Sequence, residues 1–167
     1  MPEIIKVGMA DLKVAAEPGV LITIGLGSCV GIALYDAKTR VGGLAHIMLP
    51  TSKRTTSKSN GGDLNPMKYA DTAVDMTIKK MIRENAIKKN ITAKIAGGAH
   101  MFACAKDSSS FLKVGENNVA AVKEKLRQER IKLLAEDVGL NYGRTVELHT
   151  DDGKYIIKTI AKGSKVI

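Results

Sequence analysis

A glycine-rich turn that carries a cysteine divides the first third of the chain. Segment 25–31 (GLGSCVG) lies between two apolar, β-branched runs of strand length. Glycines accept positive φ angles and let another group approach the main chain closely. They also leave backbone N–H groups free to face an anion. A thiol in such a turn is an unusual structural residue, so we interpret Cys29 as a candidate nucleophile.

The composition is typical of a soluble globular protein. The 167 residues are 44% hydrophobic and 26% charged, so we expect a single domain spanning residues 1–167. No signal peptide or long apolar run is visible, which predicts a cytoplasmic protein without membrane insertion, with both thiols reduced. The net charge of +9 favours acidic partners. The scattered basic residues and few aromatics argue against nucleic acid as a partner.

Apolar periodicity predicts strands at both ends of the chain and two main helices between them. The first helix is expected to start at Asn65-Pro66 and to end within 85–90, and the second is expected to follow 115–118. Segment 51–65 is polar and basic, and is expected to be a long loop that is either a functional lid or simply mobile. The predicted fold class is an α/β (α+β) layered sandwich with strand-rich mixed sheets. Strands are expected at residues 4–9, 12–15, 20–24, 30–35, 41–49, 91–96, 131–138, 144–149 and 155–161.

A hairpin brings a histidine towards the cysteine. If the strands on either side of Asp36 and Thr39 pair antiparallel with these two residues opposed, Cys29 falls opposite His46 on the same face. Opposed residues have Cα atoms about 4.5–5.5 Å apart. The hypothesis depends on the register of the turn, because a slip of one residue would put the two side chains on opposite faces.

A thiol beside an imidazole can attack a carbonyl carbon. An adjacent imidazolium lowers the pKa of a thiol, and the imidazolium can later protonate the leaving group. Backbone N–H groups of Gly27, Ser28 and Val30, together with that of the cysteine itself, could bind the oxyanion. The histidine needs a partner on its second ring nitrogen. Candidate hydroxyl partners are those of Thr23, Ser28 and Thr51.

Other readings of the same residues stay open. A cysteine in a strand-rich core is most often inert filler, and a histidine beside apolar residues can be buried and structural. The histidines and cysteines show no zinc-type ligand spacing, so we expect no metal site. The glycine turn lacks the known phosphate-loop patterns, and we expect no cofactor. Cys104 is interpreted as structural, and His100 and His149 as residues that fill the surface or the core.

The pattern as a whole resembles the CheD family of chemoreceptor glutamine deamidases. The resemblance rests on the segments at 23–30 (TIGLGSCV) and 45–50 (AHIMLP). It extends through 68–71, 97–102, 115–118 and 143–145, and so covers nearly the whole chain. It implies a fold similar to the catalytic domain of cytotoxic necrotizing factor toxins.

The resemblance also implies the site residues and the reaction. Cys29 would be the nucleophile, His46 the general base and acid, and Thr23 the residue that orients the imidazole. The substrates would be glutamine side chains of methyl-accepting chemotaxis proteins, converted to glutamate and ammonia through a thioester. The implied partner is CheC, a phosphatase of phosphorylated CheY.

Two alternatives to hydrolysis remain at this point. The protein could act as an adaptor that binds receptors or CheC and modulates signalling, with little use of Cys29. An amine could also replace water at the thioester, which would make the reaction a transglutamination.

Overall fold

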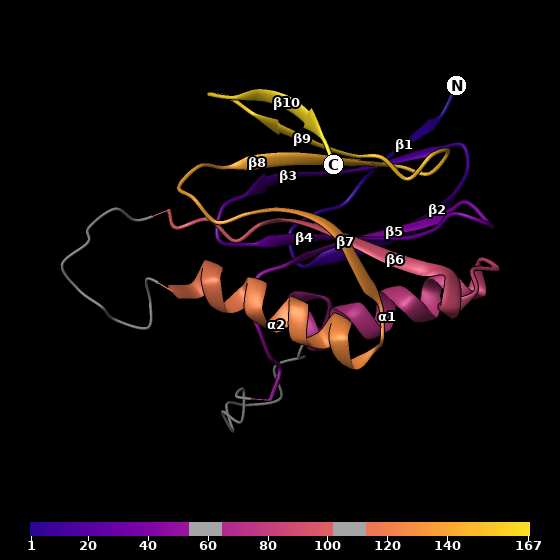
Figure 1. Ribbon diagram of the computed structural model, residues 1–167, viewed down its shortest axis with the longest axis horizontal. Coiled ribbons are helices and arrows are strands. Elements are labelled where there is room, and N and C mark those ends of the chain that lie inside the picture. The colour runs from indigo at the N-terminus through magenta and orange to yellow at the C-terminus, as the bar shows by residue number, and fades with distance from the viewer. Residues whose placement is uncertain (54–64, 102–112) are drawn as a thin grey trace.

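The protein, seen in a computed structural model, stacks two β-sheets and one layer of helices (Figure 1). The structure describes residues 1–53, 65–101 and 113–167. The helices are η1 (Pro66–Lys68), α1 (Ala70–Arg83), η2 (Lys88–Asn90) and α2 (Val114–Gln128). The strands are β1 (Glu3–Lys6), β2 (Asp11–Ala16), β3 (Gly19–Leu26), β4 (Val30–Asp36), β5 (Val41–Ile47), β6 (Ile91–Gly97), β7 (Lys132–Val138), β8 (Arg144–His149), β9 (Tyr155–Thr159) and β10 (Gly163–Val166).

The strands of the described residues form two mixed sheets. One sheet has the order β1-β3-β8-β9-β10, and the other has the order β2-β5-β4-β6-β7. The pairs β1–β3 and β6–β7 are parallel, and the other pairs are antiparallel. Figure 1 shows α1 and α2 side by side against the second sheet, on the face turned away from the first. This arrangement confirms the predicted layered sandwich of mixed sheets with two main helices.

Alternation along β4 divides the core into two layers. Ile32 and Leu34 belong to the cluster that the helices cover, and both are at most 1% exposed. Ala33, the residue between them, belongs to the cluster between the two sheets. Cys29 belongs to that second cluster as well, together with Tyr155 of the first sheet. The space between the sheets is therefore where the candidate nucleophile lies.

Each of the nine expected strands is found, with ends that differ by a few residues. The structure adds β10, which the sequence did not predict; its residues are all exposed and, within the described part of the chain, pair only with β9. Its sequence, GSKV, has neither the length nor the apolar alternation that marks a half-buried strand. Pairing with β9 alone defines this edge strand.

The two helices start differently from the prediction. Pro66–Lys68 forms a separate short 3₁₀ helix, capped by the Asn65 side chain, and α1 begins only after Tyr69. Helix α1 ends at Arg83, before the predicted range. Helix α2 begins at Val114, so segment 115–118 lies within its first turns rather than ahead of it. Glycine and asparagine are poor helix formers, and tertiary packing overrides that tendency here.

The predicted hairpin register is wrong. Asp36 pairs with Val41, which leaves four residues in the connection, and Gly31 lies opposite His46. The Asp36 carboxylate accepts hydrogen bonds from the amides of Lys38 and Thr39, and this stabilises a longer turn than the one predicted. The register is shifted by two residues, so the odd-numbered residues of β4 keep the face that they were expected to have.

Two predicted features lie wholly or largely outside the described residues. The loop at 51–65 is described only at its two ends, so its role as a lid or a mobile segment stays a prediction. Cys104 lies within the second undescribed range, 102–112.

Candidate active site between the two sheets

Thr23 and His46 form a buried pair that joins the two sheets. Thr23 lies on β3 and His46 on β5, and both side chains are at most 1% exposed. The Oγ1 atom of Thr23 lies 2.7 Å from Nδ1 of His46. Of the hydroxyl groups considered from the sequence, the structure therefore places that of Thr23 against the imidazole.

The hydrogen-bond network determines which ring nitrogen carries the proton. The Thr23 hydroxyl donates its single proton to the carbonyl oxygen of Val7, at 2.8 Å. Carbonyl oxygens only accept, so the hydroxyl must accept from Nδ1 of His46. The neutral imidazole is then protonated on Nδ1 and has its lone pair on Nε2. Among the described residues this Nε2 is buried and has no hydrogen-bond partner.

The backbone of His46 is held on both sides. Its carbonyl oxygen accepts from the amide of Ala10 at 3.0 Å. Its neighbours in the sheet are Asp11 on β2 and Gly31 on β4. An added Cβ at Gly31 would lie 2.7 Å from the hydroxyl oxygen of Tyr155. A glycine opposite the histidine thus gives the β9 side chain room beside β4.

Cys29 lies in the turn that precedes β4, two residues before Gly31. Its side chain packs in the cluster between the sheets, and the residue is 8% exposed. His46 also points between the sheets, since it reaches Thr23 of the opposite sheet. The structure thus directs the thiol and the imidazole into the same layer, although the two residues are not directly opposed. The thiol makes no hydrogen bond to Nε2 of His46.

Gly27, Ser28 and Cys29 connect β3 to β4 and are called the nucleophile turn below. The carbonyl oxygens of all three accept hydrogen bonds from other segments. The Gly27 and Cys29 carbonyls accept from the amides of Ala99 and Gly98, both at 2.8 Å. The Ser28 carbonyl accepts from the side-chain amide of Asn118 at 2.9 Å. These three bonds fix the orientation of the peptide groups on which the thiol depends.

The turn also offers backbone donors. Within the described ranges, the amides of Ser28 and Cys29 donate to no other residue. Val30 differs, because it is the first residue of β4 and pairs with both Ile47 and Gly97. The Cys29 carbonyl faces β6, so alternation in the ladder directs the Val30 N–H towards β5. The two amides just before β4 are therefore the donors most open to a ligand.

Burial disfavours charge on both candidate groups. It raises the pKa of the Cys29 thiol, an effect that the residue's own backbone N–H opposes. It also lowers the pKa of the His46 imidazole. At neutral pH both shifts favour an uncharged thiol and an uncharged imidazole. This differs from the thiolate and imidazolium that the sequence suggested, and it suits a histidine that acts as a base only when the thiol reacts.

The other two histidines have separate surroundings. Nε2 of His149 contacts a carboxylate oxygen of Glu147 at 3.1 Å, on β8. His100 is exposed and follows Ala99, whose amide donates to the Gly27 carbonyl. Within residues 1–53, 65–101 and 113–167, no three His, Cys, Asp or Glu residues lie close enough to hold a metal ion. In the same ranges, no helix is long and apolar enough to cross a membrane.

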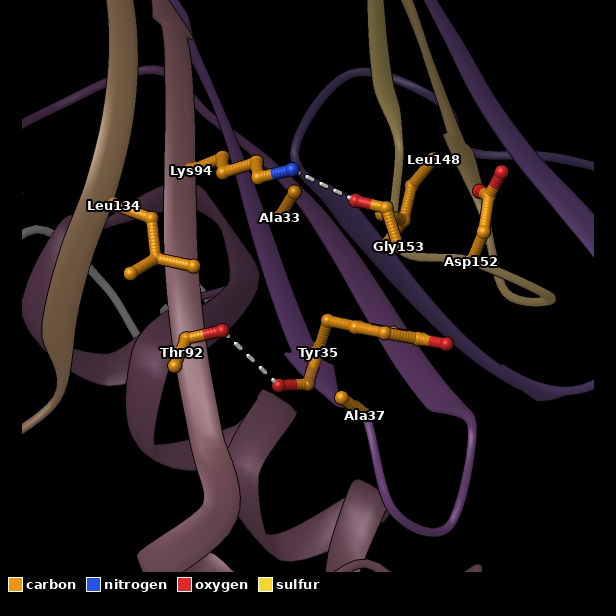
Figure 2. Close-up of a pocket in the computed structure, with 9 residues that line it drawn as sticks. All are labelled: Ala33, Tyr35, Ala37, Thr92, Lys94, Leu134, Leu148, Asp152 and Gly153. Atoms are coloured by element: carbon orange, nitrogen blue, oxygen red, sulfur yellow. Dashed lines mark hydrogen bonds between the residues drawn. The ribbon is translucent and has the colours of Figure 1, made fainter. Parts of the chain in front are cut away.

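A separate pocket lies between the sheets near the other end of β4. Figure 2 shows Tyr35, Lys94 and Asp152 among its nine lining residues. Its volume is about 160 Å³. The Lys94 ammonium donates to the carbonyl of Gly153 at 3.0 Å. Six residues of extended chain, or roughly 20 Å, separate Tyr35 from Cys29, so this pocket does not belong to the candidate site.

Asn118 belongs to the site region, but its residue type and spacing do not reveal this in the sequence. The sequence marks it only as part of segment 115–118, which matches the CheD family and is expected to precede a helix. Its complete burial and its bond to the nucleophile turn depend on packing between distant segments. The available signal of close packing here is Gly115, a glycine three residues earlier in the same helix.

Comparison with known proteins shows which family the chain belongs to. A family model described as CheD chemotactic sensory transduction matches residues 48–159, about two thirds of the chain. The chain belongs to the CheD family. The model match begins after Thr23, Cys29 and His46, but the relatives described next align with nearly the whole chain and span these residues.

Several curated members of the CheD family are close relatives. One from Caldanaerobacter subterraneus subsp. tengcongensis is 48% identical over 99% of this chain and 98% of its own length. One from Lachnoclostridium phytofermentans is 47% identical over 100% of both chains, and one from Clostridium botulinum strain Alaska E43 is 48% identical over 95% and 94%. Each is named a probable chemoreceptor glutamine deamidase CheD. Among solved structures, the hypothetical protein YfiH of Bacillus licheniformis has a TM-score of only 0.43 and 18% identity, with 78% of this chain and 51% of that one covered.

Proposed function

We propose that this protein hydrolyses glutamine side-chain amides of methyl-accepting chemotaxis receptors to glutamate and ammonia. The carrying observation is the buried Thr23–His46 pair, which leaves Nε2 of the imidazole free in the layer that holds the Cys29 thiol. The substrate class comes from the names of relatives that are 47–48% identical.

The first step of the proposed mechanism forms a thioester. The Cys29 sulfur attacks the carboxamide carbon while Nε2 of His46 takes the thiol proton. The amides of Ser28 and Cys29 are the proposed donors to the resulting oxyanion, with Gly27 providing room for the approaching chain. Nε2 then gives the proton to the leaving nitrogen. The carbon–nitrogen bond breaks, and ammonia leaves.

The second step consumes water. With Nε2 of His46 again acting as base, water attacks the thioester carbonyl. The carbon–sulfur bond breaks, glutamate is formed and the proton returns to the thiol. Thr23 acts throughout as the acceptor that keeps the proton on Nδ1, so the reactive nitrogen is always Nε2. The proposed mechanism uses no metal or cofactor.

The proposal places the protein in the cytoplasm, where thiols stay reduced. The proposal also includes binding of this protein to CheC, the partner that the family resemblance implies. The net charge of +9 supports an acidic protein surface as the docking partner.

The test is conversion of glutamine in a purified chemoreceptor. We expect the wild-type protein to release ammonia and to add about one dalton to the receptor for each glutamine hydrolysed. A Cys29→Ala variant should bind the receptor and leave its mass unchanged. Binding without conversion by both proteins would indicate an adaptor. A mass gain equal to that of an added amine would indicate transglutamination.

A further inference from the structure

Asn118, on the second turn of α2, contacts both segments that carry the candidate catalytic groups. Its side-chain nitrogen donates to the Ser28 carbonyl at 2.9 Å and to the Met48 carbonyl at 3.0 Å. Ser28 immediately precedes Cys29, and Met48 is the second residue after His46. One amide group thus joins the nucleophile turn to the end of the strand that carries the base.

The orientation of this amide group is unambiguous. Both partners are backbone carbonyls, which only accept, so the nitrogen of Asn118 must face them. Its oxygen is buried and has no partner among the described residues, and the residue as a whole is completely buried. An unpaired buried acceptor is unfavourable. The asparagine therefore satisfies two backbone carbonyls of separate segments at the cost of its own oxygen.

The first turn of α2 also packs closely against Gly98 and Ala99, the segment after β6 that donates hydrogen bonds to the nucleophile turn. An added Cβ at Gly115, three residues before Asn118, would lie 2.6 Å from the carbonyl oxygens of both Gly98 and Ala99. The amides of these two residues are the donors to the Cys29 and Gly27 carbonyls. Gly115 and Asn118 lie on one face of the helix. That face contacts the nucleophile turn directly through Asn118 and indirectly through the segment after β6.

We propose that Asn118 is a positioning residue that sets the Cys29 thiol relative to His46. This inference rests on the proposed function for its catalytic consequence. Asn118 does not touch the reacting atoms. It fixes the two peptide groups whose orientation determines where the thiol and the imidazole lie. A small displacement of a reacting group can cost a large factor in rate.

Two variants remove the bonds in different ways. Asn118→Ala removes both donors and leaves a cavity, whereas Asn118→Leu keeps the volume and removes the donors together with the unpaired oxygen. We expect both to lower kcat for receptor deamidation by about tenfold or more, with KM nearly unchanged because the completely buried Asn118 cannot contact the receptor.

Val122→Ala is the matched control. Val122 lies one helical turn further along α2, is completely buried and packs in the core beneath the second sheet. Its truncation should destabilise the protein without releasing the nucleophile turn. We expect this variant to keep the wild-type kcat at a temperature where it is fully folded.

A second readout needs no receptor. Alkylation of Cys29 by iodoacetamide, followed at the Cys29 peptide by mass spectrometry, reports how closely the turn is held. We expect faster alkylation in both Asn118 variants and a wild-type rate in Val122→Ala, so that external reactivity rises while kcat falls. This readout would still test the positioning role if the protein proved inactive on receptors.

Either of two results would overturn the inference. One is wild-type kcat and alkylation in Asn118→Leu. The other is a loss of kcat in Val122→Ala as large as that in Asn118→Ala at equal stability, which would show that α2 acts through overall stability alone.

Discussion

At the scale of single residues, the site depends on one hydroxyl group that serves two partners. The Thr23 hydroxyl donates to the Val7 carbonyl and accepts from Nδ1 of His46. This arrangement fixes the imidazole tautomer without a carboxylate. A carboxylate partner would stabilise an imidazolium, whereas a neutral hydroxyl leaves the ring neutral at rest. The raised pKa of the Cys29 thiol is consistent with that neutral resting state.

Thr23→Val tests the role of this hydroxyl group. The replacement keeps the shape of the side chain and removes its acceptor, so the proton of His46 can move to Nε2. We expect kcat for receptor deamidation to fall by about 10–100-fold, and Thr23→Ser, which keeps the hydroxyl, to recover most of that loss. Equal activity of the valine and serine variants would show that the hydroxyl does not set the tautomer.

The buried imidazole also predicts how stability depends on pH. Burial lowers the pKa of folded His46 below its usual value of 6.5, so the unfolded chain binds more protons in the interval between the two values. This contribution to stability is fully present above about pH 6.5 and is lost as the pH falls below it. The slope from this one group cannot exceed about 1.4 kcal/mol per pH unit. Urea unfolding between pH 5 and 7.5 should show a shallower slope in His46→Gln, and an unchanged slope would contradict the prediction.

At the scale of elements, the nucleophile turn is shaped by the end of β6. Gly97 has a φ of +110°, and an added Cβ would overlap the Cys29 carbonyl oxygen. The turn can therefore approach β6 only because this position has no side chain. The contact explains the glycine at the last position of β6, more than sixty residues after the cysteine.

Gly97→Ala should displace the nucleophile turn. We expect a loss of at least about 3 kcal/mol in the free energy of unfolding, from the strained φ and the overlap together, and a large loss of deamidase activity. Gly139→Ala is the control, because Gly139 also has a positive φ, +79°, but an added Cβ there meets nothing within 4 Å. It should cost only about 1–2 kcal/mol. Similar losses in both variants, measured by urea unfolding, would show that overlap with Cys29 is unimportant.

At this scale the sequence predicts features that leave a local pattern, such as strands, and not contacts between distant segments. Apolar, β-branched runs of strand length were enough to predict β3, β4 and β5, because residues in these strands are buried on both faces and leave few polar positions. The hairpin register was missed by two residues, since the Asp36 side chain stabilises a four-residue connection that strand patterning does not reveal. The contact between Thr23 and His46 crosses from one sheet to the other. Local periodicity could not predict it, and only the family resemblance singled out Thr23.

At the scale of the whole molecule, buried polar contacts tie the two sheets together. Besides the Thr23–His46 pair, the Tyr155 hydroxyl on β9 donates to the Gly31 carbonyl on β4 at 3.0 Å. Tyr155 is completely buried, and burial strongly raises its pKa. Gly31, which accepts this hydrogen bond, is the residue that lies opposite His46 in the sheet. The relative placement of the two sheets and the geometry of the site are therefore linked.

Tyr155→Phe removes this tie while keeping the ring. We expect a loss of about 1–2 kcal/mol in the free energy of unfolding, because the Gly31 carbonyl loses its buried donor. Tyr142→Phe, the same change at a half-buried ring near Arg144, should stay within about 0.5 kcal/mol of the wild type. Thermal or urea unfolding of the two variants separates these values, and equal stabilities would rule out a structural role for the Tyr155 hydroxyl.

The most direct test of the account is a search for the thioester itself. Wild-type protein mixed with purified chemoreceptor and quenched in acid within the first turnover should yield a covalent adduct of the two chains, lighter than their sum by one ammonia, or about 17 Da. Peptide mapping should place the link at Cys29, and hydroxylamine should release it. Rapid glutamine conversion with no adduct, and undiminished conversion by Cys29→Ala, would contradict the assignment of Cys29 as the nucleophile.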